Sequence, residues 1–315
     1  MTHPISKRGV SAINWQYYMI KGISRLVCML PYGATLWLGR KLGVLYYHFA
    51  PRQRDRALKQ IQESMQLSRQ EAESVIRSSF GKIAQTFLEV LYMPVLTPAT
   101  IQNYVMIENK QYLDDALAQG QGVAVLAAHM GNWEWLGAAL ALYGFPVASI
   151  IREQPNEQHT KVLNEYRRRA GIEVYSRGTS EVVGVIKALK RGKVVGFFSD
   201  QDAGRQGIFI DFFGKPASTH TGVAVFAQKL QVPVVPVFIV RKPEGGHRIM
   251  VYPPLKYEGG HESGDIAAFM TRLTQIIEDI IRQYPDEWIW FQKRWATQYQ
   301  EKAGEQDEKN YIRSD

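Results

Sequence analysis

From about residue 105 onward, short apolar runs alternate with segments whose apolar residues recur at helical spacing, and this alternation strongly constrains the fold. The apolar runs cover residues 122–128, 146–151, 193–198, 232–240 and 247–252. The helical patterns cover 110–119, 133–143, 157–170, 179–191 and 219–230. Strands that are apolar throughout and alternate with helices are typical of a sheet covered on both faces. The sequence therefore predicts an α/β fold with a mixed central sheet flanked by helices.

The first sixty residues carry the net charge of the chain. They contain ten Lys or Arg and one acidic residue, Asp55, which gives +9, whereas the whole chain has a formal charge of +8. Aromatic and aliphatic residues lie between these charges, a pattern that suits the headgroup region of a bilayer better than a nucleic acid. Two helical patterns follow, within residues 50–92. We therefore expect membrane contact and no nucleic-acid partner.

The length of the uncharged stretches limits how residues 1–50 can meet a membrane. The longest uncharged run, Leu26–Gly39, has fourteen residues and contains Pro31, whereas a span needs about twenty. No small-residue cleavage site follows it, so a signal peptide fits poorly. We expect a helical, monotopic membrane-anchoring segment facing the cytoplasm. An ordinary amphipathic helix is the alternative, and a span would require Arg40 and Lys41 to snorkel.

The absence of several motifs narrows the chemistry. The sequence has no phosphate-binding G-x-x-x-x-G-K-[ST], no dinucleotide-binding G-x-G-x-x-G after a strand, no G-x-S-x-G and no H-E-x-x-H. The single cysteine, Cys28, excludes a disulfide framework and a cysteine-cluster metal site. These observations disfavour nucleotide hydrolysis, dinucleotide redox chemistry, serine hydrolysis and zinc proteolysis.

One pair of chemically useful residues remains, in the stretch "LAAHMGNWEW". His129 and Glu134 follow the apolar run 122–128, and the carboxyl end of a strand is the usual site position in α/β sheets. Side chains five residues apart do not share a helix face, so His129 must lie in the turn and Glu134 on the first helical turns. A histidine steadied by a carboxylate can take a proton from an alcohol. The pair therefore favours direct attack by a substrate hydroxyl on an acyl donor.

These residues resemble the H-x-x-x-x-[DE] signature of the glycerolipid and lipid A acyltransferases. Further stretches resemble the branch that adds secondary acyl chains to lipid A: "SIIREQPN", "NEYRRRAG", "ALKRGKVVGFFSDQDAG", "IDFFGKPASTHTGVAVFA" and "YPDEWIWFQKRW". The resemblance covers roughly residues 10–298. It implies an α/β acyltransferase domain over residues 51–298, and the polar residues 299–315 form a C-terminal tail. "HMGNWE" differs from the best-known lauroyl and myristoyl enzymes and recurs in acyltransferases of mannosylated lipids, so both acceptor classes stay open.

The resemblance also implies roles for individual residues. His129 is expected to be the base and Glu134 its partner, while Arg152, Arg167 and Asp200 line the polar end of the site, where arginines suit a phosphorylated sugar lipid or a phosphopantetheine. The turn "MGN" and the helix start are expected to donate to an oxyanion. Weaker candidates for the site complete the set: Asn132, Arg169, Asp202 and His220. The donor is expected to be a thioester of acyl carrier protein or coenzyme A, the acceptor a glycolipid in the inner membrane, and no cofactor or metal is required.

Each assignment has a structural alternative. Glu134 could be a plain first-turn acid, His220 could cap the following helix, and the tryptophans of the final aromatic stretch could be core residues. The other histidines, His247 among them, have no partner in the sequence. Two other functional classes remain: a metal-dependent glycosyltransferase that uses Asp200 and Asp202 as a D-x-D motif, and a non-catalytic membrane-binding protein.

Overall fold

The computed structural model describes residues 15–151, 157–176, 179–260, 262–299 and 311–312. A seven-stranded mixed sheet forms its centre, in the order β1-β9-β8-β2-β5-β3-β4. Only the β8–β9 pair is antiparallel. The strands are β1 (Val105–Glu108), β2 (Val123–Ala127), β3 (Val147–Ile151), β4 (Glu173–Ser176), β5 (Val194–Phe198), β8 (Val234–Arg241) and β9 (His247–Val251).

All five strands expected from apolar runs are present in this sheet, which confirms the α/β prediction. The two strands without such a run, β1 and β4, lie at the two edges and have four residues each. Edge strands are only half covered, so a continuous apolar run is not required of them. A second sheet of three strands contains the hairpin of β6 (Ile208–Phe212) and β7 (Lys215–Thr219), with β10 (Tyr311–Ile312) beside β6.

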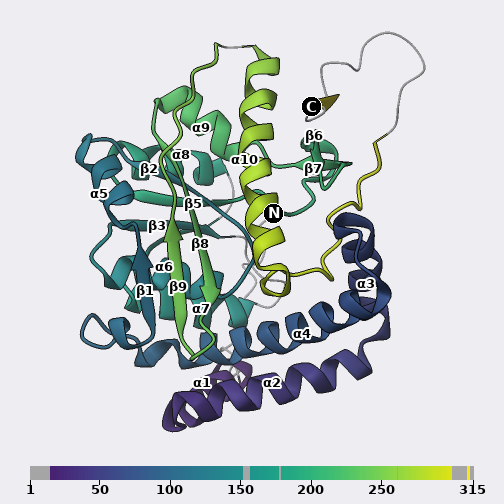
Figure 1. Cartoon of the computed structure of the whole chain (residues 1–315). Coiled ribbons are helices and arrows are strands. Elements are labelled where there is room, and N and C mark those ends of the chain that lie inside the picture. The colour runs from purple at the N-terminus through teal and green to yellow at the C-terminus, as the bar shows by residue number, and fades with distance from the viewer. Residues whose placement is uncertain (1–14, 152–156, 177–178, 261, 300–310, 313–315) are drawn as a thin grey trace, which may run out of the picture.

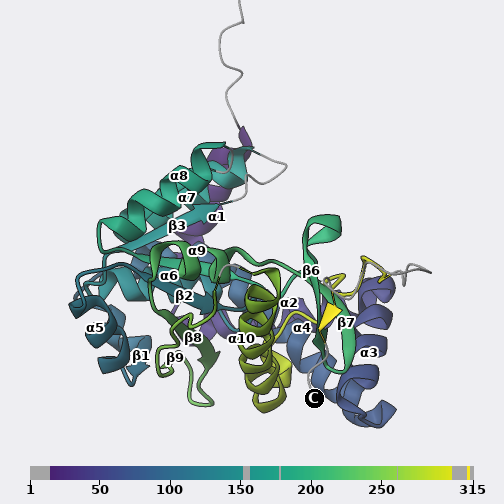
Figure 2. The same ribbon diagram turned by 90° about the horizontal axis from the view of Figure 1, so that it is seen from above.

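Helices cover both faces of the central sheet (Figures 1 and 2). Along β2 every residue is buried, and alternate residues enter two separate cores: Val123 and Val125 enter one, Ala124 and Leu126 the other. The helices α5 (Gln111–Ala118), α6 (Trp133–Leu142) and α7 (Glu157–Arg169) contribute to the first core. The helices α8 (Thr179–Lys190), α9 (Gly222–Leu230) and α10 (Ser263–Gln283) contribute to the second.

Four helices precede the sheet: α1 (Trp15–Met29), α2 (Tyr32–Phe49), α3 (Pro51–Met65) and α4 (Arg69–Tyr92). Figure 1 shows α2 and α4 side by side along one end of the molecule. Gly43 permits this close approach, because a Cβ there would overlap the backbone of Phe80 and Gly81. The hydroxyl of Ser24 in α1 donates to the Leu91 carbonyl oxygen at 2.6 Å. The first two helices are thus packed against the α/β core.

The outer side of α1 and α2 exposes large apolar side chains. Met29 and Phe49 are 79% and 78% exposed, and Trp37 is 63% exposed. No helix among the described residues is both long enough and apolar enough to cross a bilayer.

Four short 3-10 helices lie in connections of the described chain: Met93–Val95, Ile101–Asn103, Gly204–Gln206 and Pro285–Glu287. The last of these begins the C-terminal segment 285–299, which returns to the carboxyl end of β2 and pairs Met130 with Trp288 through an isolated bridge. This return brings the aromatic end of the chain to the histidine turn.

Candidate active site

His129 lies in the tight turn between β2 and α6. The turn requires Gly131, whose φ is +55° and whose Cβ, if present, would overlap the Ile239 carbonyl oxygen. Asn132 then caps α6, because its Oδ1 accepts from the Trp135 amide at 3.0 Å. The left-handed backbone at Gly131, its close packing and the Asn132 cap therefore fix the position of the imidazole.

The partner of the His129 ring is Asp200. The ring Nδ1 lies 2.8 Å from Asp200 Oδ1, and the His129 backbone N–H donates to Oδ2 at 2.8 Å. Asp200 reaches this position because β2 and β5 are parallel neighbours with Ala127 opposite Phe198, so the residues two places further on also meet. The carboxylate is fully buried. An Nδ1–H that donates to it leaves Nε2 as the acceptor, and no described residue donates to that nitrogen.

The pKa of His129 is raised. Burial alone would lower it, but the charge and hydrogen bond of Asp200 and the charge of Glu134 raise it by more. Burial would likewise raise the pKa of Asp200, yet the His129 charge and the hydrogen bonds from His129 and Trp288 lower it. Asp200 is therefore held as a carboxylate that stabilises the imidazolium.

Glu134 binds Arg167 rather than the imidazole. Its two oxygens accept from Arg167 Nε at 2.9 Å and Nη2 at 2.5 Å, and both side chains are nearly buried. The expected hydrogen-bonded pair of His129 and Glu134 is therefore not the arrangement found, since Asp200 takes that place. The reason is topological: the neighbouring strand brings a carboxylate to Nδ1, whereas α6 turns Glu134 toward α7. Glu134 acts on the imidazole through its charge.

The other candidates from the sequence are spread more widely. Asp202 accepts from the Thr297 hydroxyl at 2.8 Å and from the Gly204 amide at 3.2 Å, which fixes the loop after β5. Arg169, near the end of α7, and His220, before α9, are both exposed. Arg152 lies outside the described residues. The structure therefore brings His129, Asp200 and the pair Glu134–Arg167 together, and places Asp202 beneath them.

The expected oxyanion donors are only partly free. The Gly131 amide donates to the Glu287 carbonyl oxygen at 2.9 Å, and the Met130 amide donates to the Ala128 carbonyl oxygen at 2.8 Å. These two N–H groups are occupied, so of the expected oxyanion donors those at the amino end of α6 remain.

The C-terminal aromatic segment contributes a contact that sequence reasoning missed. The Trp288 indole N–H donates to Asp200 Oδ2 at 2.9 Å, and the Gln292 amide donates to the Asp200 carbonyl oxygen at 3.3 Å. Arg294 is buried beneath them and binds Thr219 Oγ1 at 2.7 Å. Burial lowers the pKa of Arg294 to about 10, although the charges of Asp200 and Asp202 act to raise it. Trp288 is thus a core residue, as the alternative reading held, and also a ligand of the aspartate.

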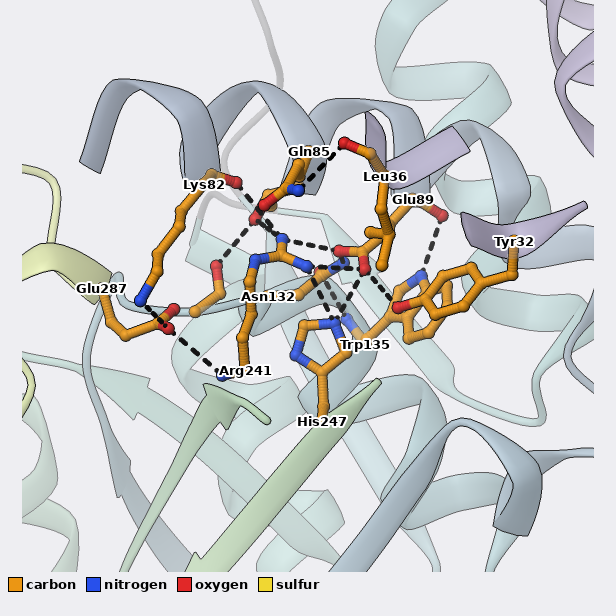
Figure 3. A network of polar contacts seen from close by, with 12 residues as sticks. Tyr32, Leu36, Lys82, Gln85, Glu89, Asn132, Trp135, Arg241, His247 and Glu287 are labelled. Atoms are coloured by element: carbon orange, nitrogen blue, oxygen red, sulfur yellow. Dashed lines mark hydrogen bonds and ion pairs between the residues drawn. The ribbon is translucent and has the colours of Figure 1, made fainter. Parts of the chain in front are cut away.

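A second group that sequence reasoning missed is centred on Glu89 of α4, which binds the Asn132 cap that follows the histidine turn (Figure 3). The buried Glu89 carboxylate accepts from Arg241 Nη1 and Nη2, each at 2.7 Å, lies 2.9 Å from His247 Nε2, and accepts from Asn132 Nδ2 at 2.9 Å. Burial would raise the pKa of Glu89, but the charges of Arg241 and His247 lower it by more. His247, which had no partner in the sequence, is thereby part of a buried charge cluster that holds the Asn132 cap.

A small apolar cavity opens beside the imidazole. It has a volume of about 80 Å³ and lies between α6 and the sheet, with Gly137, Ala148 and Gly196 among its lining residues. Trp133 and Phe198 also line it, and their rings contact the His129 ring with centroids 5.6 and 4.8 Å away. The cavity can take a short stretch of hydrocarbon next to the His129 imidazole.

Comparison with known proteins identifies the family. The family model described as "Bacterial lipid A biosynthesis acyltransferase" matches residues 5–297. The lipid A biosynthesis palmitoleoyltransferase of Escherichia coli is 26% identical, over 90% of this chain and 92% of its own. The lauroyltransferase of that organism is 25% identical over the same shares, and a phosphatidylinositol mannoside acyltransferase of Mycolicibacterium smegmatis is 26% identical over 71% and 73%. The chain is therefore an acyltransferase and belongs to the bacterial lipid A biosynthesis acyltransferase family.

Proposed function

We propose that the enzyme transfers a fatty acyl chain from a thioester donor directly to a hydroxyl group of a glycolipid, with His129 as the general base. The observation that carries the proposal is the buried Asp200 carboxylate on Nδ1, which leaves Nε2 open as a proton acceptor. The donor is a thioester of acyl carrier protein or coenzyme A. The acceptor is a lipid A precursor, with a mannosylated lipid as the second candidate because relatives named for such lipids match the chain.

The reaction follows from this geometry. Nε2 takes the proton of the acceptor hydroxyl as its oxygen attacks the thioester carbonyl carbon. The new C–O ester bond forms, the C–S bond breaks, and the proton on Nε2 passes to the leaving thiolate. Asp200 stabilises the imidazolium in between, and the amino end of α6 faces the charge that develops on the carbonyl oxygen. A short stretch of the acyl chain enters the apolar cavity beside Gly137.

Two competing functions lose support. A D-x-D metal site would need Asp200 and Asp202 to be available, but both carboxylates accept hydrogen bonds from protein groups, Asp200 from Trp288 and Asp202 from Thr297. A non-catalytic membrane protein does not agree with membership in an enzyme family.

We expect no acyl-enzyme intermediate. The one cysteine, Cys28, lies in α1, and burial raises its pKa, which makes it a poor nucleophile. The enzyme should be incubated with radiolabelled acyl donor in the absence of acceptor and quenched with acid. Protein-bound label should stay at the level of the His129→Ala variant. A covalent adduct approaching one per enzyme would refute direct transfer.

We also propose attachment at the cytoplasmic face of the inner membrane, through the outer side of α1 and α2. Because α2 is packed on α4, deleting it would uncover the core, so surface substitutions give a cleaner test. The double variant Trp37→Ser/Phe49→Ser should weaken partitioning into anionic vesicles about tenfold or more, since each aromatic ring contributes roughly 1.5–3 kcal/mol when buried. High salt should weaken what remains.

Vesicle sedimentation measures this partitioning. Met106→Ser is the control, because Met106 is also an exposed apolar residue, 42% exposed, but lies on the edge strand β1. If the double variant and the wild type partition equally, α2 does not contact the membrane.

A further inference from the structure

A second, larger cleft lies outside the acyl-transfer centre. It has a volume of about 920 Å³ and is bounded by α2, α4 and the turn that joins β8 to β9. None of His129, Glu134 or Asp200 belongs to its described lining. Its size is at the upper end of the range for small-molecule sites. The cleft therefore needs an explanation separate from the site around the imidazole.

The cleft is lined by five basic residues and one acidic residue. They are Arg40, Arg77, Lys82, Arg241 and Lys242, with Glu73 as the acid. Most of these charges are balanced by ion pairs within the protein.

Lys82 lies 2.6 Å from Glu287 and 2.8 Å from Asp286, and Lys242 lies 3.3 Å from Glu244. Glu89 balances Arg241, and Arg69 balances Glu73 at 2.9 Å.

Two guanidinium groups stay unbalanced. Arg40 of α2 and Arg77 of α4 are exposed, and neither has an ion-pair partner in the part of the chain that the structure describes. They contribute two uncompensated positive charges from helices that pack against each other. Guanidinium groups bind phosphate oxygens through paired, charge-assisted hydrogen bonds. The cleft thus offers the charge and the donor groups for a phosphate.

The inner wall of the cleft is preformed. Arg241 is 9% exposed and is held by the carboxylate of Glu89 (Figure 3), yet its Nε is buried without a hydrogen-bond partner. Gln85, on the same wall, donates to the Leu36 carbonyl oxygen at 2.9 Å and joins α4 to α2. A ligand would find these groups already in place, so little ordering cost would oppose binding.

The other wall suggests that the ligand is a lipid. Leu36, Val44 and Tyr47 of α2 line the cleft, and the same helix exposes Trp37 and Phe49 on its outer side. A molecule bound here has its charged part between Arg40 and Arg77. Its apolar part can lie against the apolar side chains of the same helix, α2. A free inorganic anion would gain no binding energy from these apolar side chains.

We propose that this cleft binds the phosphate headgroup of an anionic lipid, at a site separate from the acyl-transfer centre. Arg40 and Arg77 clasp the phosphate oxygens, and the glycerol and upper chain carbons lie along Leu36 and Val44. The site does not depend on the chemistry of His129, although its position on α2 agrees with the membrane face proposed above.

Calorimetric titration of the full-length protein with dihexanoyl phosphatidylglycerol, kept below its micelle-forming concentration, tests the proposal without a charged bilayer. The wild type should bind one molecule. Arg40→Ala/Arg77→Ala should bind about tenfold or more weakly, because hydrogen bonds to charged groups are lost. Arg40→Lys/Arg77→Lys, which keeps the charge but loses the forked donors, should fall in between.

The matched control is Lys41→Ala/Arg52→Ala, which removes the same charge from exposed positions of α2 and α3 that do not line the cleft. It should bind within about twofold of the wild type. Equal weakening of both double variants, or no binding by the wild type, overturns the site. Inorganic phosphate that binds as tightly as the lipid overturns the lipid assignment.

The His129→Ala protein separates this proposal from the proposed function. It should bind the lipid with unchanged affinity while lacking acyl transfer. If the cleft binds lipid but His129 proves dispensable for acyl transfer, the lipid site stands and the transfer mechanism falls. If His129 is essential but the cleft binds no lipid, the transfer mechanism stands and the lipid site falls.

Discussion

Replacing His129 by alanine should remove nearly all acyl transfer and leave the protein folded. General-base catalysis contributes about 10²–10⁴-fold in rate, and no other described residue stands where it could take over this proton. The side chain is 20% exposed and contributes little to the core. Turnover should be measured with saturating donor and acceptor, alongside a thermal unfolding curve. Near-normal turnover by a folded His129→Ala protein would reject the general-base assignment.

Two carboxylate variants distinguish the residue that orients the ring from the one that acts by charge alone. Asp200→Asn should cost about 10²–10⁴-fold, because the amide neither selects the Nδ1–H tautomer nor balances the imidazolium. Glu134→Gln should cost less, since Glu134 faces Arg167 and influences His129 only through its charge. A larger loss in Glu134→Gln than in Asp200→Asn would restore Glu134 as the direct partner.

The pH profile gives an independent readout of the same pair. His129 must be neutral to accept a proton, so kcat/KM should fall as the pH drops through its pKa. Because the net effect of Asp200 and Glu134 is to raise that pKa, the acid limb of the wild type should lie above 6.5, the ordinary value for histidine. Asp200→Asn removes the main raising charge and should move the limb to lower pH. An unchanged limb would show that another group sets it.

Central strands and helices were predictable because their burial requires a local pattern of apolar residues along the sequence. The runs that became β2, β5 and β8 are apolar throughout, since both faces are covered, whereas the edge strands β1 and β4 lack that signal. The turn at His129 was likewise predictable, because it must lie between an apolar run and an amphipathic helix. These features depend on neighbours in sequence.

The partners of the site residues were less predictable because they depend on topology. Asp200 is 71 residues from His129, and the two meet only because β2 and β5 are adjacent in the sheet. The spacing of His129 and Glu134 suggested a direct pair, but proximity along the chain did not decide which carboxylate reached the ring. Glu89 and His247 are 158 residues apart, and no local pattern marks a buried polar contact of that kind.

Replacing Glu89 by glutamine should strongly destabilise the fold. The substitution keeps the size of the side chain but removes the carboxylate that pairs with the Arg241 guanidinium, and Arg241 is only 9% exposed. Breaking a buried ion pair from one side costs about 3–5 kcal/mol in the free energy of unfolding, because the remaining charge stays desolvated. Urea unfolding followed by circular dichroism measures this difference.

Two further variants establish the cause of that loss. Glu73→Gln, on the same helix α4, breaks an exposed pair with Arg69, whose two side chains are 44% and 81% exposed, and should cost less than about 1 kcal/mol. Glu89→Gln/Arg241→Met removes both buried charges and should recover much of the stability lost in the single variant. If Glu89→Gln unfolds at the same urea concentration as the wild type, the cluster does not stabilise the fold. In that case the Asn132 cap, which Glu89 holds at 2.9 Å, must be maintained by its bond to Trp135 alone.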